Sequence, residues 1–278
     1  MERSIEDYIK SAQELCVLPD VYSRLVSMID QEDTRLDDIA QLISLEPALA
    51  SSVLKMANSA LFNFPKQIES IEKAVSVLGL KQISQLIHAY GITAAFAEVD
   101  TRVMDIDRFW EISVDCALLC RYLAKARKSS QADSLFLSGL FHNLGALALV
   151  HQAPEQVQYA EDYDKTATPY FRQKEALGFT FSQCSAALLA EWNVPQSIVE
   201  PITHMHSLKR CLDDENSAIL YVSARLALFN SHQGLYKKSQ LVKVELAEML
   251  ELNDDVIHEM LDQCNAEGMS ILSSLGVL

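Results

Sequence analysis

Helical periodicity runs through almost the whole of this 278-residue chain and constrains its fold more than any other feature. In the segment 36–62, apolar residues recur at intervals of three and four, as on the buried face of an amphipathic helix. No convincing run alternates apolar and polar residues as a half-buried strand would, and candidates such as 237–244 are short and charged. With only 8 glycines and 7 prolines, long loops are not expected. We therefore predict an all-α protein of roughly a dozen or more helices.

Several helix boundaries are marked by residues with known capping preferences. Pro47 stands where a second helix can begin, because proline fits the first turn of a helix. Ser70 can cap a short helix that ends just before Gly79. Pro195 predicts the start of another helix in the same way as Pro47. The segment 97–107 has a weak helical signal, and we take it as the boundary between two helical lobes.

The composition is that of a globular protein, with 49% apolar and 22% charged residues. No apolar run reaches the roughly 18 residues of a membrane-spanning helix, and the first ten residues are not signal-like, so we expect a cytoplasmic protein without a membrane partner. A formal net charge of −15 disfavours binding to nucleic acids.

The six cysteines lack the spacing of zinc knuckles, so we expect reduced, buried thiols. They are Cys16, Cys116, Cys120, Cys184, Cys211 and Cys264.

The first hundred residues also carry four short patterns in order. These are Leu18-Pro19, Glu46-Pro47, Asn58-Ser59, and the helix pattern of Ile71, Ala74, Leu78 and Gly79. Together they resemble the amino-terminal half of the HDOD domain, a bacterial signalling module related to the HD metal-dependent phosphohydrolases, and the resemblance continues to about residue 208. It implies a two-lobed helical bundle of HDOD type. We expect an N-terminal lobe over 1–100, a lobe similar to HD phosphohydrolases over 101–208, and helices over 209–278 that close the second lobe.

The resemblance also indicates where the metal ligands of an HD enzyme would fall. The first histidine should follow a Phe-Trp pair by two residues, but Phe109-Trp110 is followed at that distance by Ile112, which cannot bind a metal. The adjacent His-Asp pair of the family corresponds to His142-Asn143. The amide keeps an oxygen acceptor but loses a negative charge, and that loss is worth several kcal/mol of attraction to a divalent ion.

The later ligand positions are also changed. The family's Gly-x-Asp-His stretch corresponds to the segment 178–181, which keeps neither the acid nor the histidine. The paired histidines expected after a Trp-x-x-Pro pattern appear after Trp192 and Pro195 as His204 and His206, separated by one residue. Residues two apart on a helix point to different faces, so we do not expect both in one pocket.

Too few ligands therefore survive for a hydrolase centre, and we expect no catalytic residue and no cofactor. His142 is either a core histidine that donates to a backbone carbonyl, or the metal candidate in a residual pocket. The pocket candidates are His142, Asn143, His204 and His206. We expect the other residues of the family pattern to be structural. They are Pro19, Pro47, Asn58, Ser59, Gly79, Trp110, Trp192 and Pro195.

The resemblance favours a non-catalytic signal-transduction module that acts by binding proteins or a small ligand. The partners it implies are histidine kinases, response regulators or cyclic-diguanylate enzymes, and Phe62 and Phe64 are candidates for part of the docking surface. The alternative is a metal-dependent phosphohydrolase that acts on a nucleotide or phosphate ester with an altered ligand set. That enzyme would have to recruit carboxylates from outside the pattern, among which Asp107, Asp115 and Glu175 are the candidates. The sequence leaves the oligomeric state open.

Overall fold

The computed structural model describes residues 4–15, 18–31, 33–59, 61–62, 64–96 and 102–277. Helices make up nearly all of the regular structure in these residues, and 74% of them are helical. The described part contains no β-strand, only an isolated bridge between Asp164 and Ala167. The prediction of an all-α protein is confirmed.

The chain divides into two compact units. Unit 1 comprises residues 1–15 and 99–266, and unit 2 comprises residues 16–98 and 267–278. The change of unit near residue 98 falls close to the lobe boundary expected from the sequence. The two ends of the chain are divided differently from the three consecutive ranges expected from the sequence. The first helix belongs to unit 1, and the last residues belong to unit 2.

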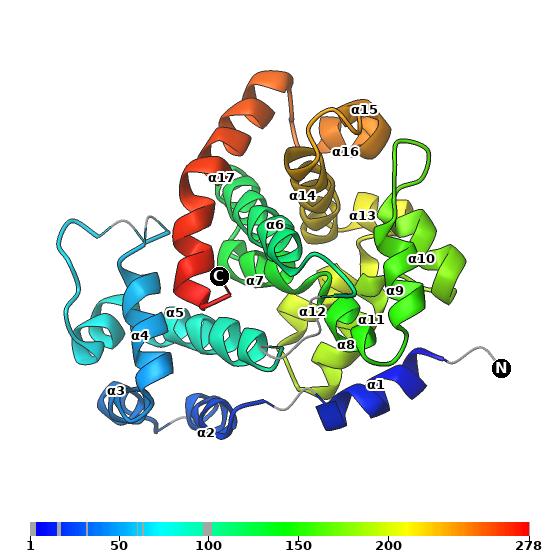
Figure 1. Cartoon of the computed structure of the whole chain (residues 1–278). Coiled ribbons are helices and arrows are strands. Elements are labelled where there is room, and N and C mark those ends of the chain that lie inside the picture. The colour runs from blue at the N-terminus through cyan, green and yellow to red at the C-terminus, as the bar shows by residue number, and fades with distance from the viewer. Residues whose placement is uncertain are drawn as a thin grey trace. The chain divides into compact units, whose positions relative to one another are not determined.

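Within the described residues, unit 2 contains four helices of its own. They are α2 (Asp20–Ile29), α3 (Leu36–Ser44), α4 (Pro47–Ala57) and α5 (Ile71–Ala94), coloured blue to cyan in Figure 1. Pro19 precedes the first residue of α2, and Pro47 is the first residue of α4, as proline's fixed φ allows. Gly79 has a φ of 76°, so the long helix is broken there into two pieces, and Ser70 caps the first piece by accepting from the Lys73 amide. The expected short helix that ends at Gly79 is therefore present.

Asn58 and Ser59 shape the chain immediately after α4. The Asn58 side chain accepts from the Ile68 amide at 2.8 Å and donates to the Ile68 carbonyl at 2.8 Å. The buried Ser59 hydroxyl donates to the Met56 carbonyl at 2.7 Å. The Asn58 side chain thus pairs with both backbone groups of Ile68 and holds the two ends of this ten-residue connection together.

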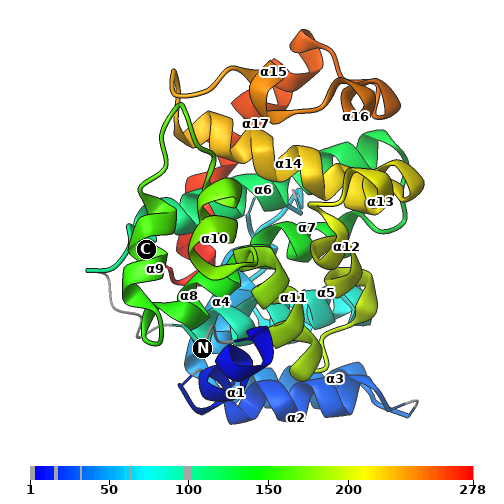
Figure 2. The same ribbon diagram turned by 90° about the vertical axis from the view of Figure 1, so that its right-hand side faces the viewer.

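Unit 1 contains most of the remaining helices. They are α1 (Ile5–Leu15), α6 (Ile106–Ala126), α7 (Ala132–Phe141), α8 (Leu144–Val150), α9 (Pro154–Glu161), α10 (Pro169–Leu177), α11 (Phe181–Glu191), α12 (Gln196–His204), α13 (Leu208–Asp213), α14 (Glu215–Ser231), α15 (Lys238–Leu241) and α16 (Val244–Met249). Helix α17 (Asp254–Leu275) begins in unit 1, and its residues from 267 onward count with unit 2. Figure 2 shows α12 beside α7 and α14, against which it packs.

Helices α6, α7 and α14 form the centre of unit 1 and are buried along most of their lengths. The segment Ala132–Val150, which holds α7 and α8, is apolar and long enough to cross a membrane by composition alone. In the structure 89% of that window is buried, as in the core helices of a folded domain. The five cysteines that the structure describes are buried, as expected, and Cys16 lies outside the described residues.

Candidate functional site

The His142-Asn143 pair lies in the turn between α7 and α8, inside unit 1. His142 is 0% exposed, and its Nδ1 is 2.7 Å from the Gly139 carbonyl oxygen. Since a carbonyl can only accept, Nδ1 carries the proton, and Nε2 is left as a bare lone pair without a hydrogen-bond partner. Burial lowers the pKa of His142 to about 4. The imidazole is therefore neutral, sealed from solvent and bonded to a backbone carbonyl.

Ser185 of α11 fixes the backbone of this turn. Its buried hydroxyl accepts from the Gly145 amide at 2.8 Å and lies 2.9 Å from the His142 carbonyl oxygen, to which it can donate. Gly145 also lies so close to α11 that a Cβ added there would be 2.2 Å from the Phe181 carbonyl oxygen. The His142 turn is therefore held by direct contact between the backbones of two helices.

Arg225 of α14 is the unexpected member of this region. The residue is only 8% exposed, yet no carboxylate of the described residues lies within 4 Å of its guanidinium. Its Nη1 donates to the Tyr221 carbonyl at 3.0 Å, and the guanidinium lies over the rings of Tyr221 and Tyr170 at 3.3 and 4.8 Å from their centroids. Contacts with aromatic faces stabilise a buried cation without an acid. The sequence offered only one signal for it, an arginine in the otherwise apolar run 218–229.

The two late histidines differ in their surroundings. His206 Nδ1 lies 3.4 Å from Arg225 Nη2, and the His206 ring packs on Tyr170 with 4.7 Å between ring centroids. Burial lowers the pKa of His206 well below its usual value, and the charge of Arg225 lowers it further. The same charge lowers the pKa of His142. Arg225 thus contacts His206 and acts on His142 through its charge, whereas His204 lies at the end of α12.

These residues do not fit a divalent metal. His206 Nδ1 accepts from Arg225, so its Nε2 carries the proton and cannot act as a ligand. The remaining donors are the Nε2 of His142 and the Oδ1 of Asn143, both without partners, and neither carries a negative charge. No group of three or more His, Cys, Asp or Glu side chains among the described residues could hold a metal ion. A fixed guanidinium close to two neutral ligands repels a divalent cation.

The carboxylates suggested for a rearranged metal site are engaged elsewhere or exposed. Asp115 accepts from the Asn230 side chain at 2.7 Å, and burial raises its pKa to about 6. Glu175 accepts from the Tyr159 hydroxyl. Asp107 is exposed in the first turn of α6. None of them joins His142 in a cluster of potential ligands within the described residues.

Other residues of the HD pattern lie inside helices or at helix ends. Trp110 is buried in α6, Trp192 follows the last residue of α11, and Pro195 precedes the first residue of α12. Thr180 caps α11 by accepting from the Gln183 amide, while the Gln183 side chain accepts from the Thr180 amide. In unit 2, the rings of Phe62 and Phe64 stack at 6.3 Å.

A small cavity borders Asn143. It measures about 30 Å³, which is room for one or two water molecules. Ile112, Asn143, Tyr170 and Gln173 contribute to its walls. Ile112 and Asn143, at the positions of the first HD histidine and the HD aspartate, thus border the same cavity, but this cavity is small.

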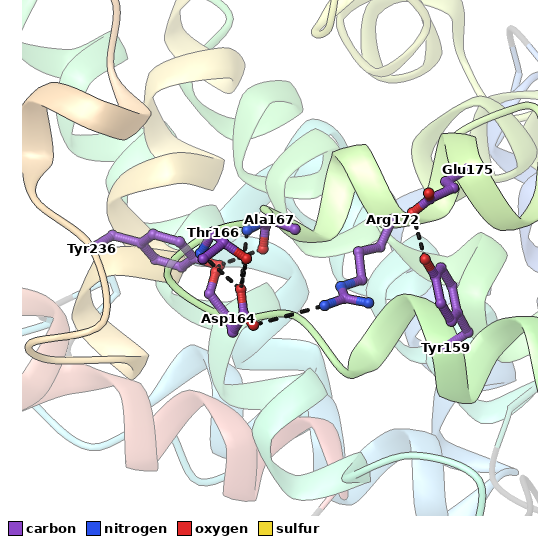
Figure 3. A network of polar contacts seen from close by, with 7 residues as sticks. All are labelled: Tyr159, Asp164, Thr166, Ala167, Arg172, Glu175 and Tyr236. Atoms are coloured by element: carbon purple, nitrogen blue, oxygen red, sulfur yellow. Dashed lines mark hydrogen bonds and ion pairs between the residues drawn. The ribbon is translucent and has the colours of Figure 1, made fainter.

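The loop between α9 and α10 is held by a network of polar contacts (Figure 3). The Asp164 carboxylate accepts from the amides of Thr166 and Ala167 at 2.7 and 3.1 Å. The Tyr236 hydroxyl lies 2.8 and 3.1 Å from the carbonyl oxygens of Asp164 and Ala167. Arg172 approaches Asp164 at 3.8 Å and lies over the Tyr159 ring. This network fixes the loop that contains Tyr163 and that joins Glu161, the last residue of α9, to α10.

The sequence profile of the HDOD domain matches residues 15–208. The chain belongs to the HDOD family. This HDOD protein is 26% identical over 213 residues to an uncharacterized protein of Treponema pallidum (strain Nichols), in a match that covers 74% of the chain and 41% of the relative. The chain thus spans less than half the length of that relative.

Two solved structures have the same fold as this HDOD protein. A "putative phosphohydrolase" from Shewanella amazonensis SB2B has a TM-score of 0.74 at 22% identity, with 96% of this chain and 97% of that chain covered. A "putative signal transduction protein" from Marinobacter aquaeolei VT8 has a TM-score of 0.69 at 19% identity, with 100% of this chain and 62% of that chain covered. These likenesses support the HDOD-type helical fold.

Proposed function

We propose that this HDOD protein is a non-catalytic regulatory module that acts in signal transduction by binding a protein or a small ligand. The observation that supports this proposal is the Arg225 guanidinium, which contacts the imidazole of His206 and whose charge lowers the pKa of His142. In an HD enzyme this region would supply anions and imidazoles to a divalent ion. Here the region holds the Arg225 cation and neutral side chains. It therefore offers no negative charge to balance a bound metal ion.

The partners we propose are signalling proteins, such as histidine kinases, response regulators or cyclic-diguanylate enzymes, in the cytoplasm. Membership of the HDOD family and the structural likeness to a protein named for signal transduction support this class of partner. The net charge of −15 favours a partner with a basic docking surface and disfavours nucleic acid.

A metal-dependent phosphohydrolase is the second candidate function, and two orphaned atoms favour it. His142 Nε2 and Asn143 Oδ1 are both buried without partners, and both atom types bind transition metals. Such an enzyme would need further ligands from outside the family pattern.

Metal analysis combined with a turnover assay separates the two functions. We expect the protein purified without chelator to contain no stoichiometric metal and to hydrolyse no bis(p-nitrophenyl) phosphate when manganese, iron or magnesium is supplied. His142→Ala should leave both results unchanged. Near-stoichiometric metal that is lost in His142→Ala, together with turnover, would reject the non-catalytic function and support the phosphohydrolase.

A further inference from the structure

A second polar region of unit 1 lies in an open pocket of about 600 Å³. Arg108 of α6, Glu161 and Tyr163 at the end of α9, and His232 at the end of α14 contribute to its walls. Arg108, Glu161 and Tyr163 also border the small cavity beside Asn143. The volume is within the range of about 300 to 1,000 Å³ that is usual for small-molecule sites.

Three polar side chains from three different elements converge in this pocket. His232 Nε2 lies 3.3 Å from Arg108 Nη1 and 3.0 Å from the Tyr163 hydroxyl. His232 Nδ1 lies 3.3 Å from the Leu228 carbonyl oxygen. The Arg108 side chain is 49% exposed, so its guanidinium is accessible from solvent.

Around His232 Nε2 there are more hydrogen-bond donors than acceptors. Because the Leu228 carbonyl accepts from Nδ1, His232 Nε2 is a bare acceptor with a single lone pair in the ring plane. Arg108 and Tyr163 both direct donors at that one lone pair, and only one of them can be fully satisfied. The other tautomer would place an N–H against the Arg108 guanidinium and a lone pair against a carbonyl oxygen. One of these two donors is therefore left for an added anion, while Arg108 Nε faces the exposed Asp105 carboxylate at 3.8 Å.

A phosphate group fits this surplus better than a carboxylate does. Phosphate offers acceptor oxygens in several directions, and arginine binds it through charge-assisted hydrogen bonds. Glu161 opposes such a ligand less than an ordinary carboxylate would, because burial raises its pKa to about 7, and its protonated form donates a hydrogen bond. The same pocket is also lined by the acceptors Asp105, Gln158 and Asp162, which suit hydroxyl donors.

We propose that this pocket binds a phosphorylated small molecule that carries several hydroxyl groups, with its phosphate on the donors of Arg108 and Tyr163. The proposal rests on the binding role given above and names the class of ligand. It uses residues outside the HD ligand pattern, and it involves no bond formation or cleavage.

Isothermal titration calorimetry of the full chain with glucose 6-phosphate and with inorganic phosphate tests the proposal. We expect both to bind, the sugar phosphate more tightly, and free glucose not to bind at millimolar concentrations. Arg108→Gln should weaken binding by about 10- to 100-fold, since hydrogen bonds to charged groups contribute about 1.5 to 3 kcal/mol. Tyr163→Phe, which keeps the ring and removes only the hydroxyl, should weaken it by about 2- to 10-fold.

Arg210→Gln is the matched control, because Arg210 is an exposed arginine of α13 in the same unit and does not line the pocket. Thermal melting shows whether each variant is folded. No binding of either phosphate compound, equal loss in Arg210→Gln and Arg108→Gln, or acetate binding as tightly as phosphate would overturn the proposal. Hydrolysis of the sugar phosphate with bound metal would instead overturn the non-catalytic function and leave the binding site intact.

Discussion

Two clusters of arginine, histidine and tyrosine lie around α14, one buried and one open. The buried cluster joins Arg225 with His206 and Tyr170, and its arginine is 8% exposed. The open cluster joins Arg108 with His232 and Tyr163, and its arginine side chain is 49% exposed. The residue types are the same, so the difference in function that we propose comes from burial.

Burial changes what each cluster can do. Arg225 is held by two aromatic rings and a backbone carbonyl, and its charge adds to burial, the larger cause, in lowering the pKa values of His142 and His206. Arg108 lines a pocket of about 600 Å³ and retains donors for a ligand. We therefore expect substitutions in the buried region to change stability and substitutions in the open region to change binding.

Gly145→Ala should have the largest effect. An added Cβ would lie 2.2 Å from the Phe181 carbonyl oxygen and 2.9 Å from the Ser185 amide nitrogen, which are backbone atoms that cannot rotate away. We expect the free energy of unfolding to fall by about 4 kcal/mol or more, measured by urea denaturation. A loss of less than about 1 kcal/mol would show that α8 and α11 can separate easily. It would contradict the claim that their backbone contact holds the His142 turn rigidly.

His142→Gln should remove a dependence of stability on pH. The folded-state pKa of His142 is lowered to about 4, below the unfolded value of 6.5, so the unfolded chain binds the proton first as pH falls. The stability that His142 contributes is complete above about pH 6.5 and is lost as pH falls towards 4, by about 3 kcal/mol.

Glutamine can still donate to the Gly139 carbonyl, but it does not titrate. Urea denaturation of both proteins at pH 7 and pH 4.5 measures the difference. Glu161 and Asp115 have raised pKa values and act in the opposite direction, but they are present in both proteins and cancel. If the free energy of unfolding changed with pH in the same way in both proteins, the claim that His142 is buried in its neutral form would be contradicted.

Ser185→Ala and Ser223→Ala form a matched pair of intermediate effect. Both serines are buried in unit 1, but the Ser185 hydroxyl accepts from the Gly145 amide, whereas the Ser223 hydroxyl has no partner. Loss of Ser185 leaves a buried amide unsatisfied and should cost about 1 to 3 kcal/mol. Ser223→Ala removes an unsatisfied group and should be neutral or stabilising. Equal effects in thermal melting would show that the Ser185 contact does not hold the His142 turn.

The sequence predicted the helical fold and the His142 environment better than it predicted the site. Periodicity and capping residues are local signals, so the helix starts at Pro47 and Ser70 could be predicted from a few neighbours. The carbonyl bond of His142, one of the two alternatives left open, also depends on a residue only three positions away. The group around Arg108 could not be found in this way, because its members lie 55 to 124 positions apart in the chain and meet only through tertiary packing.

Tyr236→Phe should have the smallest effect and a local one. Its hydroxyl bonds the carbonyl oxygens of Asp164 and Ala167, which hold the loop between α9 and α10 (Figure 3). Because the surrounding loop is exposed, we expect a loss of only about 1 kcal/mol of stability. Hydrogen exchange should nevertheless quicken at the Thr166 and Ala167 amides, whose acceptor Asp164 belongs to the same turn, and remain unchanged in α7 and α8. Faster exchange in α7 as well would mean that the open and the buried regions unfold together, so burial would no longer separate their roles.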